Sequence, residues 1–290
     1  MSRWCTDAAR ARGDDNTGTA SRVDVWILVE LPVTWGRNPI HDAVIPPDVR
    51  DALKRASAAI PRSRVVFIRK RVECLGPARV YIVRSAPEIA MQTLDLPSID
   101  AITSIDFKSL LTQHSSLITP LVLICTHGQH DSCCGRRGYP LFDALRNHDG
   151  FDLWQCSHIG GDRFAANAVV LPWGLYYGPV ETRDAAALAQ SIARDEILLD
   201  AYRGRSTMSR PVQAGETFIR RATNIVGRDA LRFVSREDLD ATHIRVCFAE
   251  EDGATHAATI ERYVAVEAAK LTCMSVREEP IAQFRLVGVM

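Results

Sequence analysis

Hydrophobic residues occur along this chain in short runs that alternate between the period of a strand and that of a helix. The first apolar, β-branched run is closed by Pro32, and two similar runs follow it around a loop containing Gly76-Pro77. Between them, Pro46-Pro47-Asp48 opens a segment that places Val49, Leu53 and Ala56 on one helical face. The N-terminal part therefore predicts a β-α-β-β order, with strands at 23–31, 64–69 and 78–84.

The same alternation returns after residue 115. Two strands flank a helix, a hairpin forms through Pro172-Trp173-Gly174, and a long amphipathic helix follows. The expected strands are 120–125, 152–156, 167–171 and 175–180, and the expected helices are 138–147 and 184–202. This β-α-β-β-β-α pattern is the thioredoxin-like order, and the pattern of 23–115 is compatible with a degenerate copy of it.

The rest of the chain predicts an irregular lead-in and a small C-terminal region. Residues 1–22 lack periodicity, and 203–207 form a plausible linker. Beyond it we expect a helix at 213–225 and strands at 231–234, 244–248 and 257–265. The sequence thus predicts an α/β protein with an N-terminal α/β domain (1–115), a thioredoxin-like domain (116–205) and a small α+β C-terminal region (206–290).

Composition narrows the class of partner. The chain has 290 residues, is 47% hydrophobic and carries 35 basic and 35 acidic side chains, so it lacks the basic excess that nucleic-acid binding favours. No stretch approaches the roughly 20 apolar residues of a membrane span, and residues 1–15 are polar without an apolar signal core. We therefore expect a globular cytoplasmic protein that binds neither nucleic acid nor membrane.

Cysteine usage points to chemistry at two loops. Four of the eight cysteines lie between 125 and 156, which in a reducing compartment indicates metal or redox use and not a disulfide framework. Cys125 and Cys134 flank a polar loop that directly follows an apolar run. A second loop, Cys156-Ser-His158-Ile-Gly-Gly-Asp162, follows another strand-like segment, and its glycines allow close approach to a cofactor. Thiolates and imidazoles on shielded loops are typical ligands of a [2Fe–2S] cluster.

Each of these residues also has an ordinary structural interpretation. Cys125 alone is more often a buried hydrophobe than a ligand, and the vicinal pair Cys133-Cys134 can arise from packing. His127 and His130 are interpreted as solvated loop histidines in preference to ligands. The combination of Cys125, Cys134 and the second loop nevertheless favours a metal or redox role.

Three segments resemble the sucrase/ferredoxin-like family. They are CTHGQHDSCCGRRGYPL, SHIGGDRFAANAVVLPWGLYYGPV and, near the N-terminus, GTASRVDVWILVELPVTWGR. The resemblance covers residues 5–181 well and the remainder weakly. It implies a thioredoxin-like ferredoxin domain that carries a [2Fe–2S] cluster, with two cysteine ligands in the first loop and, in yeast members, two histidines spaced H-x3-H in the second.

Carried over by position, the implied ligands are Cys125, Cys134 and His158, with Asp162 at the second histidine position. Carboxylate ligation is uncommon for such clusters, since a hard anionic oxygen suits iron–sulfur units less well than sulfur or nitrogen. Three interpretations stay open: Asp162 is the fourth ligand, a neighbour such as Cys156 or Cys133 replaces it, or no cluster binds.

The leading hypothesis is a [2Fe–2S] electron carrier between a reductase and an acceptor protein, with no catalytic residues of its own. One rival is a thioredoxin-like thiol oxidoreductase using Cys125, Cys133 or Cys134, although the chain lacks C-x-x-C spacing at these positions. Another is a structural zinc or metal-free interaction module. No carboxylate pair suggests the sugar hydrolysis that the family's label mentions.

Overall fold

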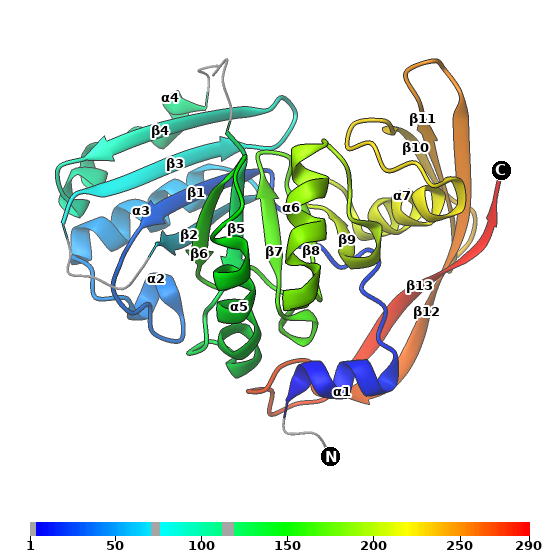
Figure 1. The fold of residues 1–290 in the computed structure, drawn as a ribbon, viewed down its shortest axis with the longest axis horizontal. Coiled ribbons are helices and arrows are strands. Elements are labelled where there is room, and N and C mark those ends of the chain that lie inside the picture. Colours follow the sequence, from blue (N-terminus) through cyan, green and yellow to red (C-terminus); the bar gives the residue numbers. More distant parts are fainter. Residues whose placement is uncertain (1–3, 71–75, 112–118) are drawn as a thin grey trace.

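The computed structural model describes residues 4–70, 76–111 and 119–290. Most of its strands belong to one large mixed sheet, which is nine-stranded within these ranges and has the order β4-β3-β1-β2-β6-β5-β7-β8-β9. A separate four-stranded sheet has the order β10-β11-β12-β13. Figure 1 shows β3 and β4 toward one side of the molecule and the small sheet on the opposite side, with α5 and α6 in front of the large sheet.

The first half of the large sheet is built from residues before 115. Its elements are α1 (Cys5–Arg12), β1 (Val25–Glu30), α2 (Pro39–Asp42), α3 (Pro47–Ala59), β2 (Ser63–Arg69), β3 (Ala78–Arg84), β4 (Ala90–Leu96), η1 (Ile99–Ser104) and α4 (Phe107–Leu110). The predicted strands and the helix after Pro47 are present. The lead-in, predicted to be irregular, contains α1, and β4 was not predicted.

The second half carries the loops with cysteine and histidine. Its elements are β5 (Leu121–Cys125), α5 (Ser132–Leu145), β6 (Asp152–Cys156), η2 (Asp162–Phe164), β7 (Ala168–Leu171), β8 (Leu175–Tyr177), η3 (Thr182–Asp184), α6 (Ala185–Ala193), η4 (Leu199–Ala201) and β9 (Tyr202–Arg205). Three predictions were wrong here, the first being the start of α5, which was expected at 138 and lies at Ser132. The helix expected over 184–202 ends at Ala193, close to Asp195 with its left-handed backbone, and the expected linker is the buried strand β9.

The two halves repeat one strand arrangement. In the first, β1 pairs β2 in parallel and β3 antiparallel, and β3 pairs β4. In the second, β5 pairs β6 in parallel and β7 antiparallel, and β7 pairs β8. The halves join where β2 pairs antiparallel with β6. The internal thioredoxin-like repeat predicted from the sequence is therefore present in the strand order.

The C-terminal region is α+β, as predicted. It contains α7 (Arg210–Thr223), β10 (Arg232–Asp238), β11 (His243–Ala249), β12 (Thr255–Ala269) and β13 (Glu279–Val289), of which β13 was not predicted. An apolar cluster that includes Ile219 and Phe248 packs α7 on the small sheet. In Figure 1 the long strands β12 and β13 run away from α7 until their connection lies next to α1.

The predicted division into 1–115, 116–205 and 206–290 stays a prediction. Its first boundary lies outside the described residues. The large sheet crosses that boundary through the pairing of β2 with β6. One face of the sheet packs under α3 in the first half and under α5 and α6 in the second, while the opposite face forms a single apolar cluster across both halves.

Candidate metal centre

The two chemistry-bearing loops leave the large sheet at the same edge. β5 and β6 are parallel neighbours, and Cys125, the last residue of β5, is the register partner of Cys156, the last residue of β6. The carboxyl ends of parallel strands form the usual position of ligand sites in such sheets. The loops that follow the two strands are therefore brought together.

The first loop is short because α5 begins earlier than the sequence pattern predicts. The helix starts at Ser132, and Asp131 caps it by accepting a hydrogen bond from the Cys133 backbone N–H at 2.8 Å. Cys133 and Cys134 thus lie in the first turn of α5. The helix also approaches β5 very closely: a Cβ added at Gly138 would lie 2.0 Å from the Cys125 carbonyl oxygen.

The second loop is held by cationic side chains that bond its carbonyl groups. Arg64, from β2 in the first half, donates to the carbonyls of His158 and Ile159 at 2.8 and 3.0 Å. The buried Arg203, from β9, donates to the Gly160 carbonyl at 3.2 Å. Gly161 has φ +87°, and an added Cβ there would lie 2.3 Å from the Arg203 guanidinium. The loop backbone is therefore fixed from two sides.

Three of the four predicted ligands converge in the structure. Ligand atoms of Cys125, Cys134 and His158 lie within 4.8 Å of one another. Asp162 adjoins them, with Oδ1 3.1 Å from Cys134 Sγ and 3.1 Å from His158 Nδ1. Figure 1 shows β5 and α5, which carry the two cysteines, and β6, after which His158 and Asp162 follow. We call Cys125, Cys134, His158 and Asp162 the loop site.

The donor chemistry of the loop site fits a thiophilic metal group. Cys125 and Cys134 are buried, and His158 Nδ1 lies 3.1 Å from Asp162 Oδ1. Two thiols and an imidazole beside a carboxylate can bind a metal once the thiols and the imidazole have lost their protons. They therefore suit a [2Fe–2S] cluster, which favours thiolate and imidazole ligands.

The thiols of the loop site differ in acidity, and Cys125 has the lowered pKa. Hydrogen bonds from the thiols of Cys134 and Cys156 hold its pKa well below the usual value, despite burial. The hydrogen bond to Cys125 and burial raise the pKa of Cys134, while burial and the same kind of contact raise the pKa of Cys156. Because metal ligands must be deprotonated, metal binding here would release protons from Cys134.

His158 and Asp162 form the second charged part of the loop site. Burial alone would lower the pKa of His158, but contacts with Asp162 and Cys125 raise it to about 9. Burial would likewise raise the pKa of Asp162, yet the contacts with His158 outweigh burial and lower it. Without metal, the two side chains are thus held as an ion pair.

His127 and His130 flank this pair in different ways. The ring of His127 uses both nitrogens: Nε2 donates to the Gly36 carbonyl at 2.6 Å, and Nδ1 accepts from the His158 backbone N–H at 3.2 Å. His130 stacks on His158 with ring centroids 3.8 Å apart, and its Nδ1 donates to the Arg37 carbonyl. Its Nε2 lies 4.0 Å from Asp162 Oδ2. His127 orients the second loop, whereas His130 keeps one nitrogen facing the loop site.

The two cysteines considered as replacements for Asp162 have different surroundings. Cys156 is fully buried and contacts Cys125. Cys133 points away from the loop site and contacts Thr6 and Cys273 at 3.3 and 3.4 Å. Among the described residues, His130 is thus a candidate fourth ligand that sequence reasoning set aside. Only its position in a ligand-rich loop, five residues after Cys125, could have signalled it.

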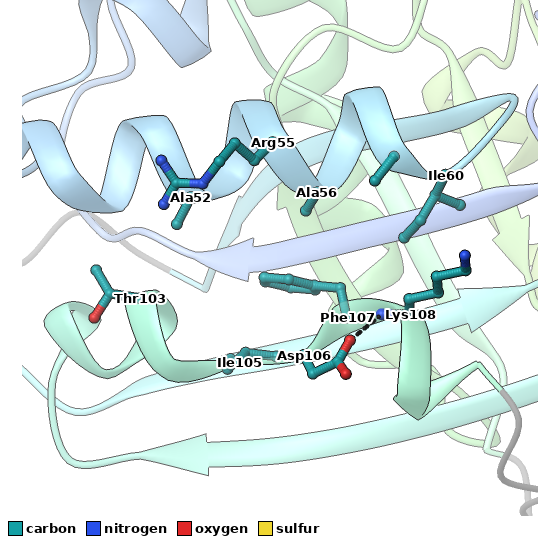
Figure 2. Close-up of a pocket in the computed structure, with 10 residues that line it drawn as sticks. Ala52, Arg55, Ala56, Ile60, Thr103, Ile105, Asp106, Phe107 and Lys108 are labelled. Carbon is teal, nitrogen blue, oxygen red and sulfur yellow. Dashed lines mark hydrogen bonds between the residues drawn. The ribbon is translucent and has the colours of Figure 1, made fainter.

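A groove on the first half of the sheet lies between α3 and the η1–α4 segment. Figure 2 shows Arg55 of α3 and the side chains of Asp106 and Lys108 around Phe107. Asp106 caps α4 by accepting from the backbone N–H groups of Lys108 and Ser109. None of the groove's lining residues belongs to the loop site.

All seven described cysteines are free thiols, while Cys74 lies outside the described residues. In the described part of the chain, no helix has the length and apolar character needed to cross a membrane.

Comparison with known proteins identifies the family. The family model of sucrase/ferredoxin-like proteins matches residues 16–204. Altered inheritance of mitochondria protein 32 from Meyerozyma guilliermondii is 29% identical over 108 residues, which cover 33% of this chain and 38% of that relative. The chain thus spans well under two thirds of that relative's length.

Two solved structures of a thioredoxin-like [2Fe–2S] ferredoxin from Aquifex aeolicus, one of them its Cys55Ser variant (in that protein's own numbering), are 17% identical with a TM-score of 0.26. They cover 29 and 30% of this chain and 96 and 91% of their own. The family model covers more than half of the chain, from the β1 lead-in through β9. The protein therefore belongs to the sucrase/ferredoxin-like family.

Proposed function

We propose that this protein binds one [2Fe–2S] cluster at the loop site and carries electrons between a reductase and an acceptor protein in the cytoplasm. The observation that supports it most directly is the convergence of two buried thiols and an imidazole, whose ligand atoms lie within 4.8 Å of one another. When bound, such a cluster accepts and releases one electron.

The protein's own residues hold and shield this position. Cys125 and Cys134 supply buried sulfur ligands, and His158 supplies nitrogen from the loop that Arg64 and Arg203 fix. Asp162 is proposed as the fourth ligand, since its carboxylate adjoins both Cys134 and His158. The guanidinium groups of Arg64 and Arg203 bring positive charge toward an anionic centre, which favours its reduced form.

Exposure indicates the side from which a redox partner would approach. The side chains of His130 and His158 are 28 and 18% exposed, whereas the two thiols are buried. We expect the reductase and the acceptor to dock over the imidazole rings, one after the other. No substrate is transformed at the site in this proposal.

The test is anaerobic purification followed by iron and acid-labile sulfide assays and an absorption spectrum. We expect about two iron and two sulfide atoms per chain. Cys125→Ser and Cys134→Ser should lose both, while Cys247→Ser, which changes a half-buried thiol in β11, should keep them. Wild-type protein without iron would overturn the proposal.

The thiol oxidoreductase is favoured by one observation, the closeness of the Cys125 and Cys134 sulfur atoms, which lie within 4.8 Å of each other. Iron-free protein in which these two thiols form a reversible disulfide would support that second function instead. Thiol titration before and after reduction, on the same preparation, distinguishes the two.

A further inference from the structure

A second group of thiols lies on the other side of the α5 N-terminus. Cys133 Sγ is 3.4 Å from Cys273 Sγ, which is 3.5 Å from Cys5 Sγ. The Asp131 carboxylate oxygens lie 3.7 and 3.8 Å from Cys5 Sγ. One ligand atom from each of these four residues lies within 4.8 Å of the others. We call Cys5, Asp131, Cys133 and Cys273 the three-thiol site.

We propose that the three-thiol site binds a divalent thiophilic cation, with Zn²⁺ as its occupant. Three sulfurs and one carboxylate oxygen form a donor set that zinc accepts in tetrahedral geometry. With Zn–S bonds of about 2.3 Å, tetrahedral ligands are about 3.8 Å apart, close to the measured separations of 3.4 to 3.8 Å. This site is separate from the proposed [2Fe–2S] centre and does not depend on it.

Burial and charge at the site call for a cation. Cys5, Asp131 and Cys133 are buried, and Cys273 is partly so. Among the described residues, no lysine, arginine or histidine forms an ion pair with Asp131. Its oxygens instead accept from the backbone N–H groups of Cys133 and Cys273, at 2.8 and 2.6 Å. A buried carboxylate beside three thiols gains most from a dication that also converts the thiols to thiolates.

A metal explains the arrangement better than a disulfide does. A disulfide would join two of the sulfurs and leave the third thiol and the carboxylate facing it. Here Cys273 Sγ contacts both of the other sulfurs, and the carboxylate comes from a fourth residue. All four positions are filled by protein groups, which is typical of structural zinc and leaves no open position for catalysis.

The donors come from three distant parts of the chain. Cys5 begins α1, Asp131 and Cys133 lie at the start of α5, and Cys273 lies in the connection between β12 and β13. Figure 1 shows this connection next to α1. Cys5 and Cys273 are outside residues 16–204, to which the family model extends. Bound zinc would therefore fasten both flanking segments to the helix turn that carries Cys134.

The experiment uses the full chain, purified without chelators and analysed for zinc and iron by mass spectrometry of the elements. We expect about one zinc per chain. Cys5→Ser and Cys273→Ser should each lower zinc at least tenfold and leave iron content and the visible spectrum unchanged. Cys247→Ser should retain zinc, and so should Cys125→Ser, which separates this site from the loop site.

Cobalt provides a second measurement. Metal-depleted Cys125→Ser protein, whose loop site has lost a ligand, should develop thiolate-to-metal charge-transfer bands and the strong visible bands of tetrahedral cobalt when titrated with Co²⁺. The same variant with Cys273→Ser added should not. The inference is overturned if wild-type protein contains no zinc and binds no cobalt. Full zinc content in Cys5→Ser and Cys273→Ser overturns it too. So does a disulfide between two of the three thiols that persists when the protein is purified under reducing conditions.

These results are distinguishable from failure of the electron-transfer proposal. Iron-free protein whose zinc is lost in Cys5→Ser and Cys273→Ser but kept in Cys125→Ser supports the three-thiol site while removing the [2Fe–2S] assignment. Protein with iron and no zinc supports the [2Fe–2S] assignment and removes the zinc proposal for the three-thiol site.

Discussion

At the scale of single residues, Asp162 is where the loop site departs from the H-x3-H spacing that the sequence resemblance implies. Its carboxylate adjoins His158 and Cys134, so we expect it to be a ligand when the cluster is bound. In Asp162→His, a neutral imidazole would replace an anionic oxygen, and the reduction potential should rise because less negative charge opposes the added electron. Protein-film voltammetry measures this shift.

His130 is the control for Asp162, because it is the other candidate for the fourth ligand and its Nε2 faces the loop site. Asp162→Ala should lose most of the cluster or change its spectrum, while His130→Ala should leave the spectrum unaltered. The reverse pattern would make His130 the fourth ligand, consistent with its stacking on His158 and its Nε2 at 4.0 Å from Asp162.

Cys156 gives a second test at the residue scale. It contacts Cys125 but does not belong to the group formed by Cys125, Cys134 and His158. We expect Cys156→Ala to keep its iron and to unfold at lower urea concentration, since removing a fully buried sulfur atom costs about 1–3 kcal/mol. Loss of iron with unchanged stability would instead identify Cys156 as a ligand.

At the scale of secondary-structure elements, the position of α5 against β5 depends on Gly138. An added Cβ would lie 2.0 Å from the Cys125 carbonyl oxygen, so Gly138→Ala must push the helix away from the strand that carries Cys125. We expect at least a tenfold loss of bound iron and a lower thermal midpoint. Gly76→Ala is the matched control because open space surrounds its Cβ position, and equal behaviour of the two variants would refute the argument.

The helix α7 is attached to the large sheet by a buried ionic network. Glu216 accepts from Arg205 and Arg220, both at 3.1 Å, and from the Tyr202 hydroxyl at 2.9 Å. Glu216→Gln leaves two buried guanidinium groups without their counter-charge, which should cost about 3–5 kcal/mol of unfolding free energy. Urea unfolding at pH 7 measures it, with the exposed Glu237→Gln as a control that should change little.

The same network predicts a pH dependence. Burial alone would raise the pKa of Glu216, but the charges of Arg205 and Arg220 lower it below its ordinary value. A lowered folded-state pKa contributes stability above the unfolded-state value of about 4.3, and this contribution is lost as the pH falls through the folded-state value. The stability gap between wild type and Glu216→Gln should therefore narrow on acidification. A constant gap from pH 7 to pH 3 would contradict it.

Element boundaries show where the sequence pattern was informative. The apolar strands β1, β2, β3, β5 and β6 follow directly from their hydrophobic runs, because burial on both faces requires them. The start of α5 was misplaced because Gly135 and Gly138 are poor helix formers. Both glycines are needed because the helix passes very close to Gly128 and Cys125, where a side chain would not fit. Tertiary contacts of this kind leave no local pattern.

At the scale of the whole molecule, the second half of the sheet carries the residues of the loop site, and the first half contributes Arg64, which holds the second loop. The sequence placed Cys125, Cys134, His158 and Asp162 in two loops, and parallel pairing of β5 and β6 brings those loops together. The supports of the second loop could not be predicted, because Arg64 and Arg203 lie far from it in sequence and belong to other strands. Their role depends on the pairing of β2 with β6 and on the position of β9 at the sheet edge.

This division leads to a prediction about Arg64, which the first half contributes to the second. Its two hydrogen bonds hold the carbonyl groups of His158 and Ile159, and hydrogen bonds from a charged donor contribute about 1.5–3 kcal/mol each. Arg64→Lys keeps the charge but cannot make the same forked contact. We expect its cluster to be lost to a chelator about tenfold faster than in wild type, and the thermal midpoint to fall by only a few degrees.

A measurement independent of iron completes this test. Amide hydrogen exchange of residues 158–162 should accelerate in Arg64→Lys because the loop loses its fixed position, and exchange in β1 and β5 should not change. The exposed Arg55→Lys, on α3 of the same half, serves as the control. If the loop exchanges at the wild-type rate in Arg64→Lys, then β6, Arg203 and Asn167 suffice to hold it, and the first half supports the site only through strand pairing.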